Sequence, residues 1–102
     1  MQQNFPFQPS SGVNTTVIPV TAASVTTNLA SVLGYDGGTL RIVNSGTQTV
    51  FIVFGAGTAL VSSMPMLANS VETFGVSGVT TSITAIAAAT GSTLYVTVGI
   101  GA

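Results

Sequence analysis

The sequence predicts an all-β protein: one domain over residues 13–102, built as a β-sandwich or small barrel of seven or eight short strands. Its segments are rich in Val, Thr, Ile and Phe, and Gly, Asn, Asp and Ser interrupt them at about ten-residue spacing. Apolar and polar residues alternate in several segments, which is the period of a strand. A length of 102 residues suffices for one core. No fixed-period repeat appears, so a solenoid is not expected.

An extended N-terminal arm is expected over residues 1–12. Pro6 and Pro9 fix their own φ angles and keep the preceding residues extended, which favours an arm rather than a strand. Phe5 and Phe7 are two residues apart and therefore project to the same side of an extended chain. They pack either on their own domain or on a neighbouring subunit, and both are candidate interface residues.

The first two strands are expected at residues 13–20 and 23–29, and Pro19 indicates a sheet edge or a bend. The sequence Asp36-Gly37-Gly38 is a turn by composition, because glycine adopts positive φ angles at little cost. A strand is expected directly after it.

The clearest hairpin candidate joins residues 39–44 to residues 49–54 through the turn-like Asn44-Ser45-Gly46-Thr47. The second strand is apolar on both faces, so it should be central or covered on its outer face, for instance by another subunit. That outer face carries Phe51 and Val53, which are candidate contact residues because so short a chain cannot cover both faces of the hairpin. In the first strand, one face carries Leu40 and Ile42 and the other Arg41 and Val43.

The second half of the chain contains three further strands. Residues 55–69 show little pattern and predict a long connection, and residues 71–76 alternate again. Residues 80–87 favour a strand over a helix because Thr and Ile are β-branched, and their irregular alternation predicts a bulge or a shifted register. The last strand, residues 92–98, places Tyr95 on the face opposite its aliphatic residues.

Charged side chains are rare. The chain has only Asp36, Arg41 and Glu72, whereas about a quarter of an average soluble domain is charged. A net charge of −1 gives little repulsion between copies and favours association. One arginine makes no phosphate-binding patch, so no nucleic-acid partner is expected. Neither a signal peptide nor an apolar run of about 20 residues appears, so we expect neither secretion by that route nor membrane insertion.

The residues needed for catalysis are also rare. Without His, Cys or Lys, the Ser and Thr hydroxyls lack an activating base, and zinc lacks its usual ligands. The remaining acid–base candidates are Asp36, Glu72, Tyr35 and Tyr95. A catalytic carboxylate pair is disfavoured because Asp36 lies in a turn, where its side chain bonds its own backbone. We therefore expect no enzymatic activity, no cofactor and no metal.

Arg41 and Glu72 both lie in expected strands and carry opposite charges. They pair with each other inside the chain, pair between subunits, or stay solvated. Exposed ion pairs contribute about 0–1 kcal/mol, and buried pairs must overcome desolvation. Both residues are candidate interface residues.

A family resemblance is carried by three stretches: TLRIVNSGTQTVFIVFGAG, MPMLANSVETFGV and STLYVTVGIGA. Within residues 39–102 the chain resembles small virion structural proteins of tailed bacteriophages, including head decoration (cement) proteins. The resemblance implies a β-sandwich or jelly-roll fold and no catalytic residues. It also implies a homodimer or homotrimer, made in the host cytoplasm, that binds the major capsid protein or another virion protein on the capsid surface. The alternative is a receptor- or glycan-binding adhesion module of a phage fibre or tail.

Overall fold

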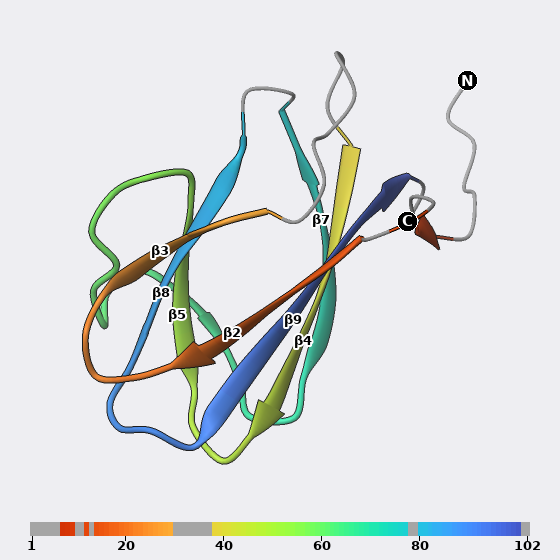
Figure 1. Ribbon diagram of the computed structural model, residues 1–102. Coiled ribbons are helices and arrows are strands. Elements are labelled where there is room, and N and C mark those ends of the chain that lie inside the picture. The colour runs from red at the N-terminus through yellow and green to blue at the C-terminus, as the bar shows by residue number, and fades with distance from the viewer. Residues whose placement is uncertain (1–6, 10–11, 13, 30–37, 78–79, 101–102) are drawn as a thin grey trace.

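The computed structural model describes residues 7–9, 12, 14–29, 38–77 and 80–100 (Figure 1). All regular secondary structure in these residues is β-strand, so the predicted all-β class is confirmed. The strands are β1 (Gln8–Pro9), β2 (Thr15–Val20), β3 (Val25–Asn28), β4 (Gly38–Gly46), β5 (Val50–Phe54), β6 (Met64–Met66), β7 (Val71–Val76), β8 (Ser82–Ala87) and β9 (Ser92–Ile100).

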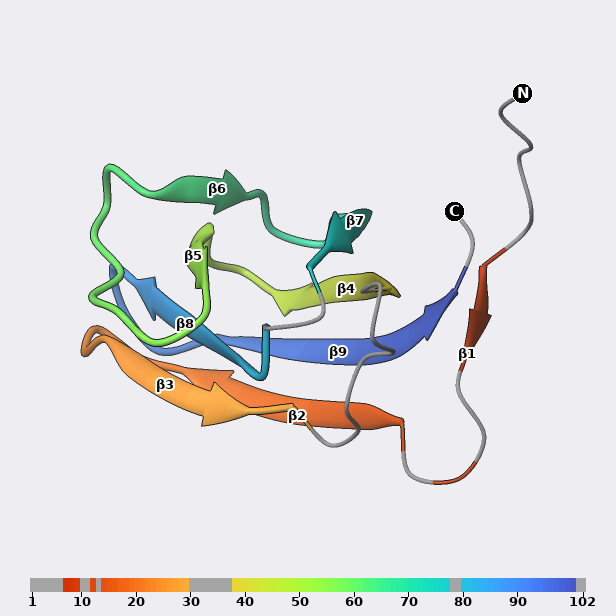
Figure 2. The same cartoon turned by 90° about the horizontal axis from the view of Figure 1, so that it is seen from above.

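The strands form two antiparallel sheets packed against each other (Figure 2). Sheet A has the order β2-β9-β4-β7. The short strand β1 pairs with the C-terminal end of β9, on the same side of β9 as β2. Sheet B has the order β3-β8-β5-β6. Between β2 and β9 the chain changes sheet at every connection except the one from β5 to β6. This arrangement of eight strands is a jelly roll, which confirms the predicted jelly-roll-like sandwich.

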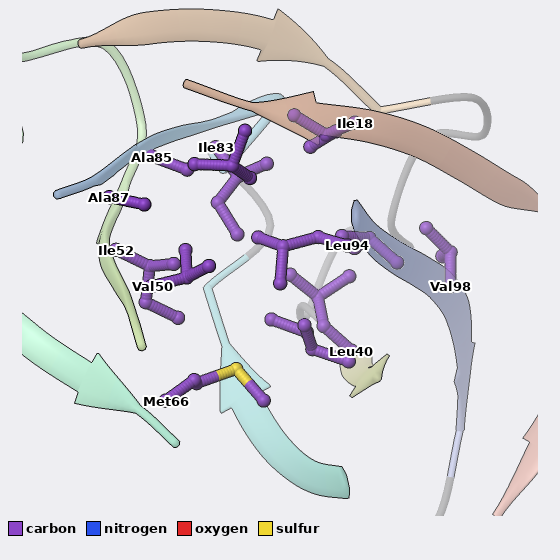
Figure 3. Packing of buried hydrophobic residues seen from close by; sticks show 13 residues of the cluster. Ile18, Leu40, Val50, Ile52, Met66, Ile83, Ala85, Ala87, Leu94 and Val98 are labelled. Atoms are coloured by element: carbon purple, nitrogen blue, oxygen red, sulfur yellow. The ribbon is translucent and has the colours of Figure 1, made fainter. Parts of the chain in front are cut away.

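The core lies between the two sheets and is built from alternate residues of the strands (Figure 3). Each large aliphatic side chain that is fully buried contributes about 1.5–3 kcal/mol to folding. Phe54 and Phe74 pack against this cluster with their rings edge to face, at a centroid distance of 5.3 Å. The buried cluster consists of Ile18, Val20, Leu40, Ile42, Val50, Ile52, Met66, Ile83, Ala85, Ala87, Leu94, Val96 and Val98.

The predicted hairpin of residues 39–44 with residues 49–54 is wrong. β4 pairs with β9 and β7 in sheet A, whereas β5 pairs with β8 and β6 in sheet B. The segment between them is an arch that crosses from one sheet to the other, and the β8–β9 connection forms a second arch beside it. Gly46 enters the first arch at a φ angle of 143°, which favours glycine. β5 lies between β8 and β6, so its predicted central position is confirmed.

The segment 80–87 is a strand, as predicted, but the predicted bulge is wrong. β8 pairs in continuous register with β5 on one side and with β3 on the other. Its alternation is irregular in sequence because both of its faces are mostly buried. One other expectation changes, because the segment 55–69 contains the short strand β6. Pro19 lies within β2 at the edge of sheet A, so the sheet edge that it predicted is confirmed.

The N-terminal arm includes a short strand where the sequence predicted an arm without one. In β1, Pro9 is opposite Gly99 of β9, and the preceding Phe7 is half-buried close to the same glycine. This part of the arm therefore packs on its own domain. Phe5 and the Asp36-Gly37 part of the expected turn lie outside the described residues.

Candidate interaction surfaces

The outer face of sheet A carries an exposed row of apolar side chains. Strand alternation turns Leu94, Val96 and Val98 of β9 into the core and Tyr95 outward. The register places Tyr95 directly between Val17 of β2 and Val43 of β4. Across the next pair of strands, Val43 is opposite Val71 of β7. Val17, Tyr95, Val43 and Val71, hereafter the apolar row, thus cross all four strands of the sheet.

The apolar row is accessible to solvent. Val17, Tyr95 and Val71 are 54%, 41% and 50% exposed, and Val43 is half-buried. Figure 1 shows β1 beside the far end of β9, as a further strand of the same sheet, and no other described segment over this face. Apolar side chains that are contiguous and exposed mark a candidate interaction site.

Hydroxyl groups flank the apolar row. On one side the register aligns Thr15, Thr97, Arg41 and Thr73, and the hydroxyl oxygens of Thr15 and Thr97 are 3.0 Å apart. On the other side it aligns Pro19 with Thr93 and Ser45. Among the described residues of the four strands, Arg41 is the one charged side chain that alternation turns to this face. The face is therefore almost electrically neutral.

The outer face of sheet B is covered in part by the chain itself. The loop over residues 55–63 leaves β5 and returns across this face toward β3, on the side away from sheet A (Figures 1 and 2). The Thr84 hydroxyl donates to the carbonyl oxygen of Gly55 at 2.8 Å, and the backbone N–H of Ala59 donates to Ser24 Oγ at 2.9 Å. Ala59 is fully buried as a result. An intrachain loop thus provides some of the cover that the sequence assigned to another subunit.

The same loop ends in an exposed turn with apolar residues at its tip. The Ser63 N–H donates to the Leu60 carbonyl oxygen at 2.8 Å, and the Leu60 N–H donates to Ser63 Oγ at 3.0 Å. Turn residues are usually polar or glycine. Here Leu60, Val61 and the following Met64 are 55%, 66% and 39% exposed. These three residues, hereafter the apolar turn, form a second exposed apolar surface on the side of sheet B.

The predicted interface residues do not come together in one site. Phe51 and Val53 are half-buried on the outer face of β5, and Phe7 lies at the end of sheet A. Arg41 and Glu72 are both exposed. The register pairs Arg41 with Thr73 and Ile42 with Glu72, so alternation turns the two charged residues to opposite sides of the sheet. They form no ion pair with each other.

The sequence alone did not predict the apolar row, although the alternation of residues placed two of its members, Val43 and Tyr95, on the faces of their strands that they occupy. Alternation alone put Val43 beside Arg41 on one face of its strand and Tyr95 on the outer face of the last strand. It could not show that β4 and β9 are neighbours, because they are separated by 45 residues between Gly46 and Ser92. Val17 and Val71 belong to the row only through that pairing.

The described residues contain no cluster of three or more potential metal ligands. Within the same part of the chain, no helix is long and apolar enough to cross a membrane. Of the four acid–base candidates, Glu72 and Tyr95 are exposed on sheet A. Tyr35 and Asp36 lie outside the described residues.

Comparison with known proteins yields no relative: no family model matches the chain, and neither a curated protein nor a solved structure matches it significantly.

Proposed function

We propose that this chain is a non-enzymatic structural protein of a bacteriophage virion that decorates or cements the capsid surface. The observation that carries the proposal is the presence of two separate exposed apolar surfaces on a nearly uncharged domain. One is the apolar row on sheet A, and the other is the apolar turn beside sheet B. A decorating subunit needs two contacts, one with the shell and one with another subunit.

Burial of these two surfaces in an assembly would be energetically favourable. Complete burial of a Val or Leu side chain contributes about 1.5–3 kcal/mol, so a residue that is half exposed can still gain about half of that on binding. With a net charge of −1, copies concentrated on a shell repel one another weakly. The resemblance of residues 39–102 to head decoration proteins points to the same role. Synthesis would take place in the host cytoplasm, before attachment to the capsid.

In this proposal the apolar turn contacts the shell. It projects from the loop and is rigidified by the two hydrogen bonds between Leu60 and Ser63, so its apolar tip is presented at little conformational cost. A protruding apolar tip fits a depression between capsid subunits, where its side chains lose contact with water.

The test is binding of the purified protein to capsids of the parent phage assembled without it, measured by co-sedimentation and mass photometry. Saturable binding is expected, and the double variant Leu60→Ser, Val61→Ser should weaken it by about tenfold or more. The control is Val25→Ser with Ile100→Ser, which removes two exposed apolar side chains elsewhere. A wild-type chain that leaves capsids bare would overturn the proposal, and equal binding by the turn variant would exclude the turn as the shell contact.

One observation favours a second candidate, a glycan-binding adhesion module of a fibre or tail. Tyr95 is 41% exposed at the centre of an open sheet face, where its ring can stack on a sugar. A glycan array separates the two candidates. Saturable binding of one glycan, lost in Tyr95→Ala, would favour adhesion, and an array without binding would favour decoration.

A further inference from the structure

We propose that the apolar row is the contact between two copies of this chain. The two sheets A pack face to face across a two-fold axis that runs parallel to the strands, between β9 and β4. The inference deepens the proposed function and rests on it, because it names the second copy as the occupant of one of the two exposed surfaces. The apolar turn stays free for the shell.

The order of residues in the apolar row supports this symmetry. A two-fold axis parallel to the strands reverses the strand order, so β2 lies over β7 of the partner and β9 over β4 of the partner. Val17 then faces the partner's Val71, and Tyr95 faces the partner's Val43. Each member of the row therefore meets another apolar side chain, and each contact occurs twice.

The polar residues beside the row also match under this operation. Arg41 faces the partner's Thr97, and Thr15 faces the partner's Thr73. The guanidinium group has five N–H donors and finds hydroxyl acceptors there, with the partner's Tyr95 ring one row away for a cation–π contact. The two Arg41 side chains do not face each other directly. Hydroxyl groups of a second copy can thus accept hydrogen bonds from Arg41 without an acidic partner.

The area of the face is adequate for a reversible dimer. Four strands about 4.8 Å apart, with about 3.3 Å of rise per residue, give a face of roughly 20 by 25 Å. Its plan area is roughly 500 Å² before side-chain relief is added, close to the ~600–800 Å² per partner of small specific interfaces. Sheets that pack face to face lie about 10 Å apart with their strands within about 30° of each other, an alignment that a two-fold axis parallel to the strands provides.

Cross-linking can test the arrangement cleanly because the chain contains no cysteine. Val17→Cys and Val71→Cys are made as two separate variants and treated with a short bis-maleimide. In the proposed dimer, position 17 of one copy faces position 71 of the other copy. Neither variant alone places two cysteines opposite each other, so each alone should give few covalent dimers. An equimolar mixture should give about tenfold more covalent dimer. Val25→Cys mixed with Leu60→Cys, two exposed positions near sheet B, is the control.

The oligomeric state gives an independent readout. Sedimentation equilibrium without capsids should show a dimer, and Val17→Ser with Val71→Ser should raise the dissociation constant by about tenfold or more. Circular dichroism and the urea midpoint verify that this variant folds. A wild-type chain that is monomeric at ~100 µM would overturn the inference, as would cross-linking that is equal in the mixture, the single variants and the control.

These results separate the inference from the proposed function. A monomer that still binds capsids overturns the dimer and leaves the decoration role intact. A dimer that leaves capsids bare overturns the decoration role and supports the contact described here.

Discussion

Asn44 and Ser92 donate hydrogen bonds to the same acceptor, the carbonyl oxygen of Gln48, at 2.9 and 2.8 Å. Ser92 Oγ also accepts the backbone N–H of Gln48 at 2.9 Å. Asn44 lies in β4 and Ser92 begins β9, whereas Gln48 lies in the arch between β4 and β5. Both side chains are buried. These hydrogen bonds fasten the arch to sheet A. Because the arch leads into β5 of sheet B, they also hold the two sheets together at this end of the jelly roll.

Asn44 should be among the most sensitive polar positions in the protein. Its Nδ2 also donates to the carbonyl oxygens of Met66 and Leu67, at 2.9 and 3.1 Å. Asn44→Ala removes all three hydrogen bonds, although the Gln48 carbonyl oxygen keeps Ser92 Oγ as a donor and the Leu67 carbonyl oxygen keeps Ser70 Oγ. We therefore expect a loss of about 1–3 kcal/mol in the free energy of unfolding. Urea denaturation measures this loss. Asn28→Ala, at an exposed position of β3, should change it by less than about 0.5 kcal/mol.

The stability of the variant Asn44→Asp should depend on pH, which gives a second test of the hydrogen bonds at Asn44. A buried carboxylate faces carbonyl oxygens at this site and loses hydration, so its pKa should rise above the unfolded value of about 3.9. A raised folded-state pKa means that the variant is most stable below about pH 4 and loses stability as the pH rises through the folded pKa. The wild-type amide does not titrate. A variant whose deficit relative to wild type is equal at pH 3.5 and pH 7 would contradict the proposed geometry.

A series of three glycines separates backbone strain from steric conflict. Gly46 has a φ of 143°, and a Cβ there would collide with the carbonyl oxygen of Gly91 in the second arch. Gly55 has a φ of 93° with open space around it, and Gly75 has open space and no positive φ. We expect Gly75→Ala to be nearly neutral, Gly55→Ala to cost about 1–2 kcal/mol, and Gly46→Ala to cost more than about 3 kcal/mol. Thermal unfolding of the three variants should follow that order, and equal effects at residues 46 and 55 would contradict the close packing of the arches.

The arm should depend on a glycine in the strand on which it lies. A Cβ at Gly99 would collide with the Phe7 ring and the Gln8 carbonyl oxygen. We expect Gly99→Ala to release the arm, so that amide exchange of Gln8 accelerates by about tenfold or more, while core amides change little. Hydrogen exchange with mass spectrometry measures both.

A truncation lacking residues 1–12 provides the comparison for the arm. It should still fold but assemble less well on capsids, and Gly99→Ala should share that defect. Unchanged assembly in both variants would show that the arm is passive. If the Gln8 amide exchanged as slowly in Gly99→Ala as in the wild type, that result would contradict the packing of the arm on Gly99.

Alternation in the sequence predicted which side chains enter the core, but not which strands are neighbours. It sorted Leu40 with Ile42 and Val50 with Ile52 onto one face of their strands, and in the structure all four side chains are buried. The predicted hairpin between these strands was wrong, because a short polar segment with a glycine suits an arch as well as a hairpin. The choice depends on contacts with the second arch, more than 40 residues later.

The interaction surfaces escaped prediction for related reasons. β6 is three residues long with Pro65 in its middle, too short for any periodic signal. The cover over sheet B comes from a loop whose hydrogen bonds are made to Ser24 and Thr84, both distant in sequence. The apolar row exists only through the pairing of four strands. Composition predicted an assembly, whereas the candidate contact surfaces can be recognised only from the register of the strands.

The loop that carries the apolar turn should depend on one buried hydroxyl. Thr84 is fully buried, donates to the Gly55 carbonyl oxygen at 2.8 Å, and lies 2.8 Å from the hydroxyl oxygen of Thr26. Thr84→Val keeps the shape but leaves both partners short of a hydrogen bond, so we expect a loss of about 1–3 kcal/mol in the free energy of unfolding. The measurement is urea denaturation together with hydrogen exchange of residues 55–63, which should accelerate more than the core.

Thr21→Val is the matched control, because the Thr21 hydroxyl makes an exposed hydrogen bond, accepting the Ala23 N–H at 3.2 Å, away from the outer face of sheet A. Water can replace that bond, so the loss there should stay below about 0.5 kcal/mol and exchange in the loop should not change. If the proposed shell contact is right, Thr84→Val also weakens capsid binding, because a loosened loop must be ordered again when the apolar turn binds. Equal stability and equal loop exchange in the two variants would contradict the role of Thr84 as the anchor of the loop.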